Sequence, residues 1–219
     1  MIPLRDESRS LERFPVVTTC IIAINVGVYI LEMAGGDTFV TAWSVVPANI
    51  TAGHDWITIL TAMFMHASWP HILGNMVFLW AFGPQIEEAM NPRRYATFYL
   101  LGGIAAMLAQ IAADPGSRVP CLGASGAIAA VMGAFLVTYP RDKIRTLFFF
   151  GWFVRVTFIP AVILIGFWFL IQLISVGAVA DVQSGGVAYL AHIGGMIFGA
   201  VIARPFEDKR RLAARRDDD

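Results

Sequence analysis

The sequence predicts an all-α membrane protein, a compact bundle of six transmembrane helices, and three observations predict it. Of the 219 residues, 57% are hydrophobic and only 15% charged, and the mean hydropathy is +0.65. A soluble domain has about 45–50% apolar and about 25% charged residues. Six apolar stretches each approach the roughly 20 residues that cross a bilayer. The basic residues fall in alternate loops between these stretches.

The expected spans follow one another closely, except across one long first loop. Residues 1–13 form an N-terminal tail, 14–206 the six-helix domain and 207–219 a charged C-terminal tail. The stretch from Thr146 to Arg155 is expected to approach span five along the membrane interface. The six spans are Phe14–Ala34, Trp69–Ile86, Tyr95–Ala113, Cys121–Tyr139, Val156–Ala180 and Val187–Phe206.

The long first loop, from Gly35 to His66, contains two apolar pieces that are too short to cross a bilayer. These pieces are Phe39–Ile50 and Trp56–Met65. Such pieces lie in the interface or enter the membrane and return. Trp43 suits the headgroup level, where an amphipathic ring is stable. The sequence therefore predicts an interfacial or re-entrant first loop.

The distribution of basic residues predicts the orientation. Fifteen of the 16 lysines and arginines lie in the N-terminal tail, between spans two and three, between spans four and five, or after span six. The exception is Arg118. Because basic loops remain in the cytoplasm, both termini are expected there.

Polar side chains of three separate spans are expected at one depth. Spans two, four and six all enter from the outer face. His71 and Asn75 follow the start of span two, Ser125 that of span four and His192 that of span six. At 1.5 Å per residue these groups lie roughly 6–8 Å below the outer helix ends.

Small residues line the helix faces that carry two of these groups. Ser125 is followed on its own face by Ala129 and Gly133, and His192 by Gly195 and Gly199. Small residues at this spacing let membrane helices approach closely. Packing of the two faces would bring the serine within hydrogen-bond reach of the histidine. A serine hydroxyl is a weak nucleophile until a base takes its proton, and imidazole exchanges a proton near neutral pH.

Acyl transfer also needs hydrogen-bond donors for the oxyanion. His71 and Asn75 are four residues apart, so their side chains share one helix face. The backbone N–H of Ser125, in the first turns of its helix, is a further donor. The positive ends of the helix dipoles favour negative charge at the same place.

These residues stand in motifs that resemble those of the rhomboid family. The motifs are Gly123-Ala124-Ser125-Gly126, Ala191-His192-Ile193-Gly194-Gly195 continuing to Gly199, and His66 followed by His71-Ile72-Leu73-Gly74-Asn75. The resemblance covers about residues 14–206. It implies a six-helix rhomboid bundle with a Ser125–His192 dyad and no acidic third member. It also implies cleavage of other membrane proteins within or beside their transmembrane segments, in a bacterial inner membrane.

The resemblance assigns further roles. It places His71 and Asn75 in the oxyanion hole and His66 near the mouth of the site. Glu87 would help to hold the cytoplasmic side. The supporting glycines are Gly123, Gly126, Gly195 and Gly199.

The chain departs from the family at two positions. Ile57 follows Trp56 where some relatives have an arginine, which removes an expected anchor of the first loop. Ala129 stands where others have a tyrosine stacked on the catalytic histidine. The group that orients the His192 ring is therefore expected elsewhere.

Three alternatives compete with an intramembrane protease. A non-catalytic relative that binds membrane clients would lack the serine or the histidine, and both are present. A small transporter needs an internal repeat or an acidic coupling residue, for which Glu32 is the one candidate. A metalloprotease would carry His-Glu-x-x-His, which is absent. We expect no metal, no cofactor and no nucleic-acid partner; the expected partners are transmembrane substrates and the lipid bilayer.

Overall fold

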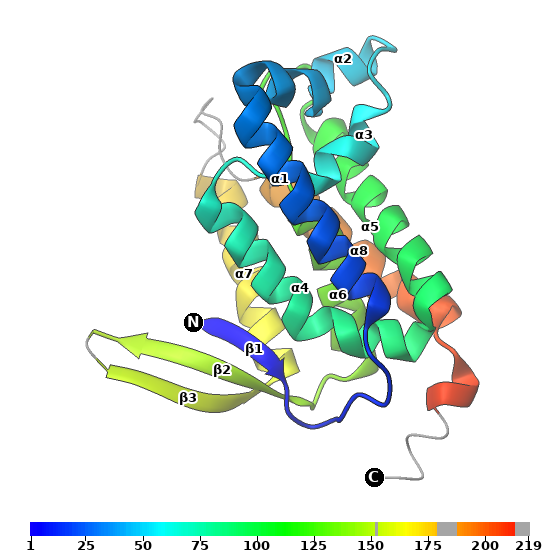
Figure 1. Ribbon diagram of the computed structural model, residues 1–219, viewed down its shortest axis with the longest axis vertical. Helices are drawn as coiled ribbons and strands as arrows, with labels where there is room; N and C mark the ends of the chain where they lie inside the picture. The colour runs from blue at the N-terminus through cyan, green and yellow to red at the C-terminus, as the bar shows by residue number, and fades with distance from the viewer. Residues whose placement is uncertain (152, 179–187, 213–219) are drawn as a thin grey trace.

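The computed structural model is a helical bundle with a small antiparallel sheet beside one end (Figure 1). It describes residues 1–151, 153–178 and 188–212. The expected boundaries at Ala180 and Val187 and the last seven residues of the C-terminal tail lie outside them. The main helices are α1 (Val16–Trp43), α4 (Trp69–Met90), α5 (Pro92–Ala113), α6 (Ser125–Thr138), α7 (Ala161–Ala178) and α8 (Tyr189–Phe206). The short helices are α2 (Pro47–Thr51), α3 (Thr58–Thr61) and the 3-10 turn η1 (Ala62–Phe64); the strands are β1 (Ile2–Asp6), β2 (Lys143–Phe150) and β3 (Phe153–Pro160).

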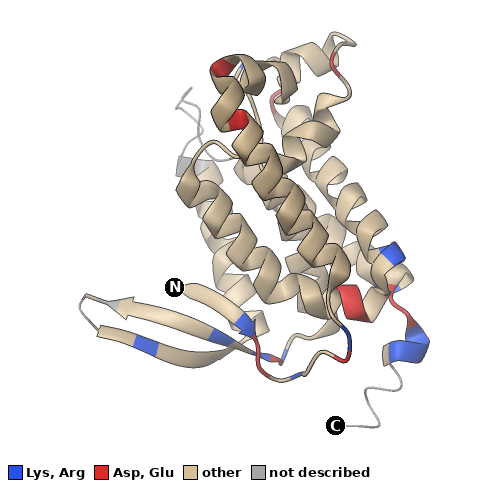
Figure 2. Cartoon of the chain, in the orientation of Figure 1, with Lys and Arg blue, Asp and Glu red and all other residues tan. Residues whose placement is uncertain are grey.

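The main helices follow the order expected of the spans. Within the described part of the chain, α1, α5 and α8 are long and apolar enough to cross a membrane, and α6 and α7 contribute shorter apolar stretches. Figure 2 shows lysines and arginines gathered near the end of the bundle that carries both termini, with few charges on the helices above it. The predicted membrane protein is confirmed in this coarser form, whereas the count of six spans stays a prediction.

Helix α1 is longer than predicted. It continues past the expected boundary at Gly35 as far as Trp43, with a kink at Gly36, where φ is 58° and ψ is −153°. A residue with a Cβ rarely adopts this backbone conformation, so glycine permits the kink. Part of the expected first loop is therefore helix, and α2, α3 and η1 occupy the remainder.

The prediction of an all-α fold is wrong for residues 143–150 and 153–160 and for the N-terminal tail. Strands β2 and β3 form an antiparallel hairpin, and β1 pairs with β2. Span five accordingly begins at Ala161, not at Val156. The hairpin is rich in aromatic and β-branched residues, which favour strands. The same residues raise hydropathy as a membrane span does, so composition concealed the boundary.

The first strand is held to the bundle by a cluster of charged side chains. Arg9 donates to the carboxylate of Asp142 at 2.7 Å, and the Ser8 N–H donates to Asp6 at 2.9 Å. Burial, together with the nearby Asp142 carboxyl, raises the pKa of Asp6 to about 7. Asp6 therefore binds a proton in the folded protein over a pH range in which it is ionised in an unfolded chain.

This proton makes the attachment of β1 dependent on pH. Asp6 contributes fully to the stability of the folded form below its ordinary pKa near 4, and this contribution is lost as the pH rises through about 7. We therefore expect Asp6→Asn to protect the β1 amides from hydrogen exchange more than wild type at pH 8, with little difference at pH 5. Asp37→Asn, at an exposed position of α1, is the matched control. An equal effect of Asp6→Asn at both pH values would contradict the prediction.

Helix α6 forms the centre of the bundle, and every residue from Gly126 to Phe135 is buried. It packs closely on α8 because glycines alternate across the contact. A Cβ on Gly195 would overlap the carbonyl of Gly126, and a Cβ on Gly199 would overlap that of Ala130. The predicted small-residue faces thus meet backbone to backbone.

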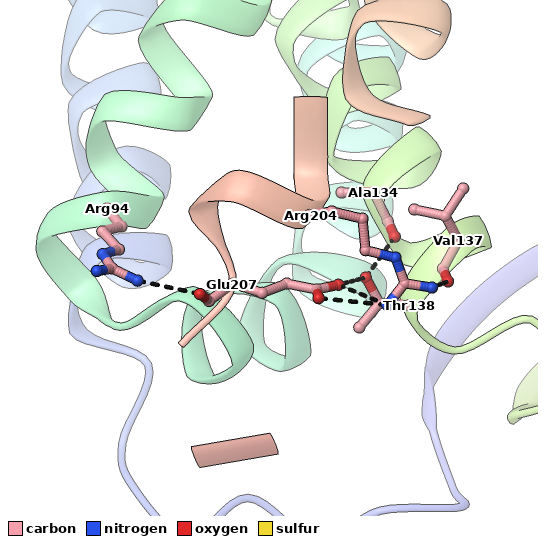
Figure 3. Close-up of polar contacts among 6 residues, drawn as sticks. All are labelled: Arg94, Ala134, Val137, Thr138, Arg204 and Glu207. Atoms are coloured by element: carbon pink, nitrogen blue, oxygen red, sulfur yellow. Dashed lines mark hydrogen bonds and ion pairs between the residues drawn. The ribbon is translucent and has the colours of Figure 1, made fainter. Parts of the chain in front are cut away.

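Polar contacts join the start of α5 to the C-terminal ends of α6 and α8 (Figure 3). The Glu207 carboxylate accepts from Thr138 Oγ1 at 2.9 Å and from Arg204 at 3.3 Å. Arg94 donates to the Glu207 carbonyl at 3.0 Å, and Arg204 donates to the Val137 carbonyl at 2.6 Å. These contacts fix the ends of α6 and α8 opposite to those that carry Ser125 and His192.

Candidate active site

Ser125 and His192 face each other across the α6–α8 contact. The distance from Ser125 Oγ to His192 Nε2 is 2.7 Å, a short hydrogen bond. Ser125 is the first residue of α6, and His192 lies in the first turn of α8. His192 is buried and Ser125 is half-buried. The two residues thus lie at the same end of neighbouring helices, as the sequence predicts.

The chain reaches Ser125 through an extended segment, not through a helix beginning near Cys121. Cys121 pairs with Val45 by two backbone hydrogen bonds of 2.7 and 3.0 Å. Gly123 has φ of +133° and donates its N–H to the Ala62 carbonyl at 2.8 Å. This positive φ favours glycine. The serine consequently lies at the helix N-terminus, where its own N–H has no partner within the helix.

His71 lies beside the serine. A Cβ on Gly123 would meet His71 Cε1 and Nε2 at 3.0 Å and Ser125 Oγ at 3.6 Å, so both side chains border the space beside the Gly123 Cα. Nδ1 of His71 accepts from the Ala67 N–H at 3.4 Å. A neutral ring that accepts at Nδ1 carries its proton on Nε2. That N–H is on the edge of the ring next to Ser125.

Asn75 belongs to a second layer of contacts on the same side. Its amide nitrogen lies 2.9 Å from His66 Nε2, and the His66 ring packs edge-on against His71 with centroids 5.1 Å apart. The His66 backbone N–H donates to both carboxylate oxygens of Glu32, at 3.1 and 3.0 Å. An amide nitrogen has two hydrogens, so Asn75 has a second donor besides the one toward His66.

The arrangement contains parts needed for acyl transfer: a nucleophile in hydrogen-bond contact with a base, and the His71 ring beside Gly123. The described residues contain no group of three His, Cys, Asp or Glu side chains able to hold a metal ion.

Comparison with known proteins identifies the family. The model of the rhomboid domain matches residues 53–207, more than half of the chain. The chain belongs to the rhomboid family. It is 29% identical over 189 residues to rhomboid protease GluP of Bacillus subtilis, covering 84% of this chain and 34% of that protein. It is also 29% identical over 165 residues to mitochondrial rhomboid protein 1 of Saccharomyces cerevisiae, covering 71% of this chain and 44% of that protein. The chain therefore spans less than half the length of these relatives.

Two residues at the site of this rhomboid, Gln172 and Trp168, were not predicted from the sequence. Gln172 Oε1 lies 2.7 Å from His192 Nδ1, and the ring of Trp168 lies 5.5 Å from the His192 ring at 42°. Both belong to α7, and Gln172 faces the ring nitrogen opposite to the one that faces Ser125. The sequence does indicate Gln172 as a polar residue within an apolar run, and the structure shows that it is buried. Its partner could not be read from the sequence, because the packing of α7 against α8 decides it.

The other predicted supporting residues lie further along the helices of the rhomboid bundle than Ser125 and His192 do. Gly126 and Gly195 form the close helix contact directly below the dyad, and Gly199 continues it one turn further. Glu87 is near the other end of α4. Its carboxylate accepts from the N–H groups of Val17 and Thr18 at 2.9 and 2.8 Å. It thereby holds the start of α1.

Proposed function

We propose that this chain is an intramembrane serine endopeptidase that cleaves transmembrane segments of other membrane proteins. The observation that carries the proposal is the 2.7 Å contact between Ser125 Oγ and His192 Nε2, in a helical chain of the rhomboid family. Relatives named as proteases support it. The alternative, a rhomboid-like protein that only binds membrane clients, would not need a nucleophile and a base in hydrogen-bond contact.

In the proposed reaction His192 Nε2 takes the proton of Ser125 as the hydroxyl oxygen attacks the carbonyl carbon of the scissile peptide bond. The carbonyl oxygen becomes an oxyanion, and the tetrahedral intermediate collapses as His192 gives the proton to the leaving nitrogen. Water then attacks the acyl-enzyme with His192 again as base, and the ester bond to Ser125 breaks as His192 returns the proton to the serine oxygen. The products are two peptide chains with a new carboxyl and a new amino end.

The oxyanion is proposed to lie between the Ser125 backbone N–H, His71 Nε2–H and the free hydrogen of Asn75. His71 is proposed as a donor because its Nε2 and the Ser125 Oγ border the same space beside Gly123. His66 holds the Asn75 amide nitrogen at 2.9 Å, and the second hydrogen of this amide is the proposed third donor. Donors in fixed positions stabilise developing charge without reorganisation.

The size of the space beside Ser125 supports a preference for small side chains at the cut. A cavity of about 10 Å³ lies next to the serine, room for about one water molecule. Its wall is made chiefly of small or apolar residues: Met63, Gly103, Ala106, Gly126, Ala127 and Ala191. A transmembrane substrate is proposed to enter laterally, between α4 and α7, and to unwind locally at the site.

The proposed location is a bacterial inner membrane, with both termini in the cytoplasm and the site near the outer face. The gathering of lysine and arginine at the end with the termini supports this orientation, because basic segments remain in the cytoplasm (Figure 2).

Reconstitution tests the proposal. The purified chain is incorporated into liposomes with a labelled single-span substrate, and the products are mapped by mass spectrometry. We expect a cut near the outer membrane boundary after a small residue, and loss of the cut when a fluorophosphonate modifies the serine. Intact substrate under conditions in which the fold is retained, together with measurable binding of the substrate, would favour the client-binding alternative.

Asn75→Ala should lower kcat about 100-fold or more with little change in KM. The physical reason is that an oxyanion donor acts in the transition state and not on the bound substrate, and loss of one costs about 10²–10³ in kcat. Initial rates over a range of substrate densities in the liposomes separate the two constants.

Asn49→Ala is the matched control for Asn75→Ala. The Asn49 amide donates to Asp55 at an exposed position of the first loop, so its loss removes a side-chain hydrogen bond away from Ser125. A raised KM with unchanged kcat in Asn75→Ala would assign this residue to substrate binding instead.

A further inference from the structure

Gln172 is a buried polar side chain on a helix that is otherwise largely apolar and exposed. Its exposed fraction is 6%. The neighbouring large side chains of α7 point away from the bundle: Val162, Ile163, Phe167, Leu170, Leu173 and Ile174. A buried amide needs hydrogen-bond partners, because an unpaired polar group costs free energy in an apolar environment. Gln172 has two partners, the His192 ring and the Trp168 carbonyl.

The orientation of the Gln172 amide is determined by its two neighbours. Its Nε2 donates to the Trp168 carbonyl one turn earlier in α7, at 3.2 Å, and its Oε1 faces His192 Nδ1 at 2.7 Å. The reverse orientation would place Oε1 against the Trp168 carbonyl, acceptor against acceptor. The carbonyl oxygen of the amide therefore faces the ring.

This orientation determines where the imidazole proton lies. Oε1 of Gln172 can only accept, so Nδ1 of His192 must carry the proton. In a neutral ring Nε2 then has a free lone pair, and it is this atom that lies 2.7 Å from Ser125 Oγ. Only a ring in this tautomer can take the serine proton. The opposite tautomer would present an N–H to the nucleophile.

We propose that Gln172 is the positioning residue that holds His192 in the Nδ1–H tautomer and so completes the Ser125–His192 pair as a third, uncharged member. Trp168, with its ring 5.5 Å from the imidazole, supports the plane of the ring, and Gln172 determines its rotation and its proton. The effect on cleavage rests on the proposed protease function, whereas the tautomer does not.

An amide suits this place better than a carboxylate does. A charged side chain is costly within a membrane, and a buried charge needs a partner that compensates it at all times. The imidazole is charged only during the reaction. The Gln172 amide oxygen accepts a hydrogen bond from the ring as a carboxylate would, but it carries no permanent charge. It therefore stabilises the imidazolium less than a carboxylate would.

Nitrogen NMR of the histidines tests the tautomer directly. The chain, labelled with ¹⁵N-histidine in micelles, contains four histidines, and the signals missing in His192→Gln belong to His192. We expect a protonated Nδ1 and an unprotonated Nε2 in wild type. Gln172→Leu, similar in size but without an acceptor, should shift the ring toward the Nε2–H form, whereas Gln172→Glu, which retains an acceptor oxygen, should not. The same His192 signals in Gln172→Leu and wild type would overturn the proposal.

Kinetics of the same variants provide a second measurement. Gln172→Leu should lower kcat roughly 10²-fold, within the range for general-base catalysis, with KM unchanged within about twofold. Gln172→Glu should recover part of this loss, and Ile174→Ala, exposed on the same helix, should behave as wild type. Unchanged kcat in Gln172→Leu, or no recovery with glutamate, would overturn the proposal. If wild type cleaves no substrate, the protease function fails, and the NMR signals still decide the role of Gln172.

Discussion

Ser125→Ala is expected to reduce peptide cleavage by about 10⁴-fold or more, to the background of the assay. The physical reason is that the variant has no atom that can form the acyl-enzyme, and its remaining N–H donors act only on the uncatalysed attack of water. His192→Ala should cause a loss of similar size, because a serine without its base is a poor nucleophile. The double variant should be no worse than either single variant, since the two residues act as a unit.

The measurement is the initial rate of substrate cleavage in liposomes, beside labelling of the serine by a fluorophosphonate. Ser125→Ala should not be labelled, and His192→Ala should be labelled slowly. Ser117→Ala, between α5 and α6, and His54→Ala, between α2 and α3, remove the same kinds of side chain and should retain wild-type rates. Losses that multiply in the double variant, or cleavage retained in either single variant, would refute the proposed roles.

The sequence predicts the helical order and the convergence of Ser125, His192 and His71 for a physical reason. In a membrane helix each residue advances a fixed distance, so the position of a side chain in its span determines its depth. Spacing of small residues further indicates which faces can meet. The depth of a side chain and the spacing of small residues are both set within one helix, so neither depends on how a distant segment packs.

Features that depend on competition between segments could not be predicted. Residues 156–159 are β-branched or aromatic and mostly apolar, so they suit both a strand and the start of an apolar span, and pairing with β2 decides between them. The start of α6 at Ser125 depends on the Cys121–Val45 pairing, a contact between distant parts of the chain. Gln172 depends in the same way on how α7 packs against α8.

The close contact of α6 and α8 leads to the second prediction of large effect. Gly199→Val should destabilise the fold by about 3 kcal/mol or more, at the upper end of the cost of overpacking. Its Cβ would overlap the carbonyl of Ala130, which is main chain and cannot change rotamer. The helices must therefore separate, and the hydrogen bonds and contacts on both sides of the interface lengthen. Thermal unfolding in detergent, followed by the exposure of the half-buried Cys121 and Trp168, measures the loss.

Gly27→Val is the control for this prediction. It introduces the same side chain at a helical glycine, but a Cβ on Gly27 has no heavy atom within 4 Å. Its stability should change by no more than about 0.5 kcal/mol, as for surface substitutions. Equal melting temperatures for the two variants would show that the α6–α8 contact tolerates separation.

The smaller change Gly199→Ala connects this contact to the chemistry. A single methyl group already overlaps the Ala130 carbonyl, so α8 must shift while the fold survives. His192 lies seven residues before Gly199 on the same face of α8, and its bond to Ser125 crosses the same interface. A displacement of about 1 Å at a reacting pair costs about 10²-fold in rate. We therefore expect Gly199→Ala to lower kcat by more than its change in melting temperature would explain, and a kcat that follows stability alone would separate the helix contact from the alignment of the dyad.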